Sequence, residues 1–137
     1  MKVVWLSLAL CGLSSTAHAA AHGMAPMVEA VDQPVAEGVV TAEKIVAPET
    51  GWLVVHRTGA EMKPGPVVGH APLRKGENLD VAAILTEAVA PGEMLMLMVH
   101  SEAGGMQTGI FEYTLGATED GPIRIDDKLV MTVITAQ

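Results

Sequence analysis

The sequence has little cysteine, few aromatic side chains and little positive charge. Its 137 residues include one cysteine, two tryptophans, one tyrosine and one phenylalanine, and 8 basic side chains stand against 16 acidic ones. Sites that stack sugars or single-stranded bases use aromatic faces, which are scarce here. A formal net charge of −8 repels nucleic acid and anionic lipid. We therefore expect no nucleic-acid partner.

The first 21 residues have the three parts of a signal peptide. Lys2 supplies the positive charge, residues 3–13 are apolar, and small residues follow. Ala17 and Ala19 allow cleavage after residue 19, whereas Ala19 and Ala21 allow cleavage after residue 21. The sequence predicts a secreted protein, periplasmic or extracellular.

The single cysteine, Cys11, lies inside this predicted leader. A lipoprotein signal is the alternative, but it requires a small residue before the cysteine and Leu10 stands there. Cleavage would leave a chain without thiols, which excludes disulfides, thiol catalysis, zinc–thiolate sites and cysteine-ligated copper. The longest later apolar run, residues 94–99, is too short to cross a bilayer, so we expect no transmembrane segment.

Apolar, β-branched stretches alternate with Gly- and Pro-containing turns, which is typical of an all-β domain. We expect a mobile lead-in over residues 22–37 and one antiparallel β-sandwich over residues 38–137, immunoglobulin-like in architecture without its paired cysteines. A closed barrel is the alternative architecture. The predicted strands span residues 38–46, 52–57, 67–70, 79–85, 94–100, 109–113 and 129–135. Residues 78–90 are also compatible with a helix, because they are rich in Ala and Leu.

Histidine and methionine are the candidate metal ligands. In a strand, His56 shares a face with Trp52 and Val54, and His100 shares one with Met98. Imidazole and thioether groups together suit copper, particularly Cu(I). The candidate ligands are His22, His56, His70, His100 and Met98.

Each candidate has a plainer interpretation. Residues 94–98 are apolar on both faces and fit a central strand in which methionines fill the core. His56, His70 and His100 are isolated in sequence and fit hydrogen-bonding roles equally well. His22 could chelate Cu(II) through its amino group and imidazole only if cleavage exposes it as the first residue.

No motif for catalysis is present, since the sequence has no phosphate-binding glycine loop, nucleophile elbow or zinc-protease motif. We expect a protein that is not an enzyme. The first functional hypothesis is a secreted β-sandwich that binds a protein or cell-envelope partner, and the alternative is a periplasmic copper-binding protein.

The order of several elements resembles a family of uncharacterised domains in secreted proteins of halophilic archaea and bacteria. The elements are Gly51-Trp52-Leu53-Val54-Val55-His56, Val68-Gly69-His70-Ala71-Pro72-Leu73, Met98-Val99-His100-Ser101-Glu102, Gly109-Ile110-Phe111-Glu112-Tyr113, Asp120-Gly121-Pro122 and Asp127-Lys128-Leu129-Val130. The resemblance implies an all-β extracytoplasmic domain and no known activity. It directs attention to His56 and His100 and to two further polar positions, Glu102 and Glu112.

Overall fold

The structure is a computed structural model that describes residues 23–137. The predicted signal peptide and the candidate ligand His22 lie outside the described residues. Within them the chain forms strands, turns and loops and no helix. In this part of the chain, accordingly, no helix is long and apolar enough to span a membrane.

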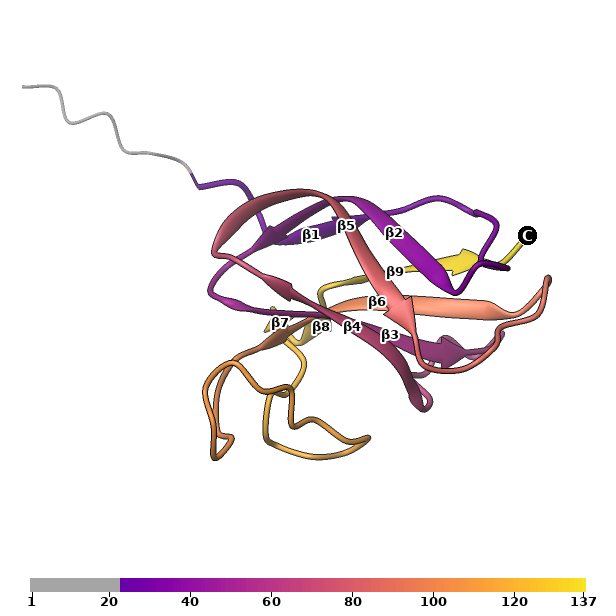
Figure 1. Cartoon of the computed structure of the whole chain (residues 1–137). Coiled ribbons are helices and arrows are strands. Elements are labelled where there is room, and N and C mark those ends of the chain that lie inside the picture. Colours follow the sequence, from indigo (N-terminus) through magenta and orange to yellow (C-terminus); the bar gives the residue numbers. More distant parts are fainter. Residues whose placement is uncertain (1–22) are drawn as a thin grey trace, which may run out of the picture.

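Seven strands form one antiparallel sheet in the order β1-β2-β5-β4-β3-β6-β9, and two short strands form a separate hairpin (Figure 1). The strands are β1 (Met27–Glu29), β2 (Val39–Ala47), β3 (Gly51–Thr58), β4 (Val67–Leu73), β5 (Gly76–Leu85), β6 (Met94–Ser101), β7 (Arg124–Ile125), β8 (Lys128–Leu129) and β9 (Met131–Thr135). Most of the connections between them contain the Gly, Pro, Asn or Asp residues that turns favour. The exceptions are the β4–β5 turn, which is Arg74-Lys75, and the break between β8 and β9, which is Val130 alone. The expected all-β fold is confirmed.

The sheet curls until its two end strands come close. A parallel bridge joins Gln33, just after β1, to Ala136, just after β9. In Figure 1, β2 and β5 lie opposite β3, β4 and β6, so the sheet encloses its core as a sandwich whose two layers are continuous. The architecture is a nearly closed sheet, between a sandwich and a barrel.

The core consists of aliphatic side chains, as the low aromatic content requires. Leu53 and Val55 of β3 and Leu95, Leu97 and Val99 of β6 point into it and are fully buried. These residues alternate along each strand, which is the two-residue period of side chains in a sheet. One face of β3 and β6 therefore packs into the main core, and the other face carries the candidate site.

Four expectations need correction. Residues 109–113 are not a strand, because they belong to a long loop between β6 and β7. The predicted mobile lead-in contains β1, which pairs with β2 through contacts such as Val28 with Ile45. The last predicted strand is divided at Val130 into β8 and β9. The alternative of a helix over residues 78–90 is also wrong, since residues up to Leu85 form β5.

Candidate functional site

The outer face of β3 and β6 is buried as completely as the inner face. Every residue on it that lies between the strand ends is at most 7% exposed, namely Trp52, Val54, His56, Met96, Met98 and His100. This layer is separate from the main core cluster. The loop of residues 102–123, here called the cover loop, supplies Phe111 and Tyr113 to it, and it lies below the sheet in Figure 1.

Main-chain hydrogen bonds fasten the cover loop at both ends. The Ser101 amide donates to the Gly121 oxygen at 2.9 Å, and the Ile123 amide donates to the Val99 oxygen at 2.9 Å. The fully buried carboxylate of Asp120 accepts from the amides of Ala103 and Glu112 at 3.1 and 2.8 Å. These bonds satisfy donors that burial would otherwise leave without partners.

His56 and His100 meet beneath this loop, and we call them the His pair. Their Nε2 atoms are 3.3 Å apart, and both residues are 0% exposed. The two histidines lie on neighbouring strands but are not register partners, because His56 faces Met96 and His100 faces Trp52. Their imidazoles therefore lean toward each other along the strands.

The position between the two histidines is filled by Val54 and Met98, which face each other across β3 and β6. Because side chains two residues apart share a face, Met98 lies on the same face as the His pair and next to His100. Tyr113 packs on the imidazoles from the cover loop, with ring centroids 4.5 Å from His100 and 5.9 Å from His56. The pair thus has Val54 and Met98 on its own face of the sheet and the Tyr113 ring packed on it.

Hydrogen bonds fix which nitrogen of each imidazole carries a proton. His56 Nδ1 is 2.8 Å from the Gly65 oxygen, and His100 Nδ1 is 2.7 Å from the Asp120 oxygen. A carbonyl oxygen only accepts, so each Nδ1 must donate. In the neutral form each Nε2 then carries a lone pair and no proton. The 3.3 Å contact consequently brings two acceptors face to face.

Burial keeps both imidazoles neutral. It lowers the pKa of His100 to about 4, with a further lowering from nearby His56 and an opposing effect of the bond to Asp120. Burial also lowers the pKa of His56, against the hydrogen bond to Gly65. Near neutral pH, therefore, no proton lies between the two Nε2 atoms to offset the repulsion of their lone pairs.

A bound cation would relieve this contact. Two nitrogens that coordinate one metal with tetrahedral geometry and bonds of 2.0–2.1 Å lie about 3.3 Å apart, which is the separation of the two Nε2 atoms. Over residues 23–137, no three His, Cys, Asp or Glu side chains form a group that could hold a metal. Within residues 23–137, any further ligand must therefore come from another donor type, such as the Met98 thioether.

His70 does not join the pair. It lies on the same face of β4, opposite Val54, but its exposed ring stacks on Phe111 at 4.3 Å and contacts the edge of Trp52 at 5.6 Å. Partial burial lowers the pKa of His70. Of the four predicted ligands inside the domain, the structure brings together His56 and His100, with Met98 on the same face and His70 apart.

The two acidic candidates organise the cover loop. Glu102 accepts from Trp52 Nε1 at 2.8 Å and from the Gly109 amide at 3.2 Å. Glu112 accepts from the Gln107 amide at 3.1 Å. Both carboxylates bind donors of the chain itself and neither points to a reacting group.

Sequence reasoning missed the residues that orient the His pair. Gly65 supplies the carbonyl to His56, and a side chain there would meet the Arg57 oxygen, because an added Cβ would lie 2.7 Å from it. Asp120 supplies the carbonyl to His100 with a left-handed φ of 45°. The turn sequences around Pro64-Gly65-Pro66 and Asp120-Gly121 were visible, but nothing local links them to a histidine 9 or 20 residues away.

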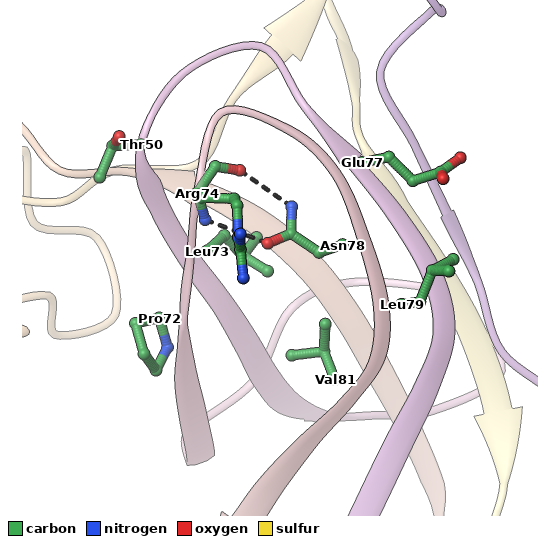
Figure 2. Close-up of a pocket in the computed structure, with 8 residues that line it drawn as sticks. All are labelled: Thr50, Pro72, Leu73, Arg74, Glu77, Asn78, Leu79 and Val81. Carbon is green, nitrogen blue, oxygen red and sulfur yellow. Dashed lines mark hydrogen bonds between the residues drawn. The ribbon is translucent and has the colours of Figure 1, made fainter.

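A cavity of about 780 Å³ lies elsewhere, between β4 and β5 (Figure 2). Only Gly69 with Leu85 and His70 with Ile84 pair these strands, and Pro72 lacks the amide needed to continue the ladder. Two of the polar side chains that line this cavity, Asn78 and Glu77, have partners in the fold. Asn78 bonds the main chain of Arg74 at 3.1 and 2.9 Å, and Glu77 forms an ion pair with Lys44.

Comparison with known proteins places the domain in a family. Residues 26–137 match the family described as "Domain of unknown function (DUF7282)". No curated protein and no solved structure matches the chain significantly. The matched range covers all nine strands and the cover loop. The chain therefore belongs to the DUF7282 family of domains of unknown function.

Proposed function

We propose that this protein is a non-catalytic, extracytoplasmic binding domain that holds one Cu(I) ion at the His pair. The observation that carries the proposal is the 3.3 Å contact of two Nε2 atoms whose Nδ1 atoms both donate to carbonyls. Such a pair offers two lone pairs to one cation without releasing a proton. The leader-like residues 1–21 support a location outside the cytoplasm.

The choice of Cu(I) follows from the donors near the pair. Met98 lies on the same face of β6 as His100 and is fully buried. Thioethers prefer soft ions, whereas Zn²⁺ sites use thiolate, imidazole and carboxylate ligands. The excess of acidic side chains favours the approach of a cation.

The test is a titration of the purified mature protein with Cu(I), under anaerobic conditions, against a competing chromophoric chelator. We expect one equivalent bound with submicromolar affinity. The variants His56→Asn and His100→Asn keep a donor at the Nδ1 position and remove the Nε2 ligand, so each should lose at least about tenfold in affinity, the effect of one lost ligand interaction.

His70→Asn is the matched control, because His70 is exposed and its ring contacts Phe111 and Trp52 and neither imidazole of the pair. It should bind Cu(I) as the unaltered protein does. Absence of stoichiometric binding by folded, processed protein would exclude the proposal. Copper that survives in the doubly substituted protein, and is lost on blocking the amino terminus, would instead assign binding to His22.

A second candidate is an interaction module for a protein or cell-envelope partner. It is favoured by three exposed apolar side chains of the cover loop, Met106, Ile110 and Leu115, which are 91, 53 and 55% exposed. Replacing them by serine should then weaken retention in the cell envelope while leaving Cu(I) affinity unchanged.

A further inference from the structure

The Met98 thioether, which lies on the same face of the sheet as the His pair, is connected to the protein surface by a second methionine. Met98 of β6 faces Met131 of β9 in the antiparallel register. Directly opposed residues have Cβ atoms about 4.5–5.5 Å apart, and methionine is long and flexible, so their sulfur atoms can contact one ion together. Met98 is 0% exposed, whereas Met131 is only partly buried. The two methionines therefore connect a buried position to an accessible one.

Met131 opens on a surface cavity that contains another thioether. This cavity, of about 380 Å³, lies between β1, β9 and the β7–β8 hairpin and is lined by Met27, Met131, Leu129 and Asp126, among others. It lies where the curled sheet does not close, because β1 pairs with β2 on one side only and β9 pairs with β6 on one side only. Two thioethers thus line the same opening, together with one carboxylate, Asp126, and one ammonium group, Lys128.

The opposite approach to the His pair is obstructed. Tyr113 covers the imidazoles, and the cover loop is fastened to β6 by the bonds from Ser101 to Gly121 and from Ile123 to Val99. Both histidines are fully buried, so an ion must reach them through the protein. Met27 and Met131 line one cavity and Met131 faces Met98, so these three flexible side chains mark the alternative approach.

We propose that Met27 and Met131 form a surface subsite that receives Cu(I) from a soluble carrier and passes it through Met98 to the His pair. This inference rests on the proposed function. The ion remains Cu(I) throughout, since each step exchanges one neutral ligand for another. No proton leaves, because the Nε2 atoms are unprotonated and thioethers carry none.

The test measures the rate of transfer from a Cu(I)–bicinchoninate complex to the mature protein by stopped-flow absorbance. Met27→Leu/Met131→Leu removes both surface thioethers at nearly constant volume. We expect transfer to slow by about tenfold or more, as for loss of a stabilising interaction at the rate-limiting step. Equilibrium affinity should change by less than about twofold, which corresponds to about 0.4 kcal/mol. Met106→Leu, in the exposed part of the cover loop, is the matched control and should transfer at the original rate.

Three outcomes decide the inference. Original transfer rates in the double variant would overturn it. Equal losses of rate and affinity would also overturn it, because Met131 would then be a ligand of the final site. A surface subsite also predicts weak Cu(I) binding by the double variant His56→Asn/His100→Asn. Adding Met131→Leu to that double variant should remove the binding. Failure of the unaltered protein to bind Cu(I) would reject the proposed function itself. A normal transfer rate in the Met27→Leu/Met131→Leu variant would reject only the surface subsite.

Discussion

Asp120 determines the tautomer of His100. Its main-chain oxygen accepts the Nδ1 proton at 2.7 Å, while its carboxylate holds two amides of the cover loop. One buried residue therefore both orients an imidazole and fastens the loop that covers it. The stability of the loop and the chemistry of the His pair are coupled through this residue.

Asp120→Asn should destabilise the protein by about 1–3 kcal/mol, because an amide has one acceptor oxygen and leaves one buried amide without a partner. Asp126→Asn is the control, since Asp126 has a similar φ of 48° but is exposed. Urea unfolding measures both variants. Equal stability of the two would show that the Asp120 carboxylate is not needed.

Glu102→Gln should loosen the middle of the cover loop. Glutamine offers one oxygen where glutamate accepts from both Trp52 and Gly109. The loss of one hydrogen bond of about 1 kcal/mol should speed hydrogen exchange at the Gly109 amide about fivefold. Glu112→Gln keeps the single bond to Gln107 and should leave that rate unchanged. The measurement is amide exchange by NMR.

Gly51→Ala should prevent stable folding or destabilise the protein by about 3 kcal/mol or more, as expected for a clash in a packed interior. A Cβ at Gly51 would lie 2.1 Å from the main-chain oxygen of His100, which the β3–β6 ladder holds in place. Gly59→Ala is the control, because nothing lies within 4 Å of its added Cβ. Thermal unfolding compares the two, and similar melting temperatures would contradict the close approach.

Acid should destabilise the metal-free protein through His100. Burial lowers its pKa in the folded state from 6.5 to about 4, so the unfolded chain takes up a proton at higher pH than the folded chain does. The stability that the neutral His100 contributes to the folded protein is fully present above pH 6.5 and is lost as the pH falls toward 4. The expected loss at pH 4 is about 3 kcal/mol.

His100→Asn isolates this contribution from that of the carboxylates, because it removes only the titrating ring and keeps the donor to Asp120. Urea unfolding at pH 8, 6, 5 and 4 should give a shallower decline for the variant. Parallel declines of the two proteins would mean that His100 does not titrate between folded and unfolded states.

Local sequence identified most of the strands and the faces they present. The apolar run of β6 predicted a strand buried on both sides, and alternation correctly placed His100 on one face with Met96 and Met98. Phe111 and Tyr113 also alternate as in a strand, which produced the wrong prediction for residues 109–113. Their apolar rings face the sheet from a loop, because aromatic side chains gain burial wherever a covering segment holds them.

The sequence by itself determined the all-β class, the aliphatic core and the residue types able to bind a soft metal, because strand periodicity, turn residues and donor chemistry are local properties. Only the tertiary structure decided that His56 and His100 meet while His70 does not, and that Met131 faces Met98. Strand order and register bring together residues 44 positions apart, and no local pattern encodes those pairings. The same contacts set the tautomers, since the carbonyls of Gly65 and Asp120 reach the histidines only when the β3–β4 hairpin and the cover loop have closed.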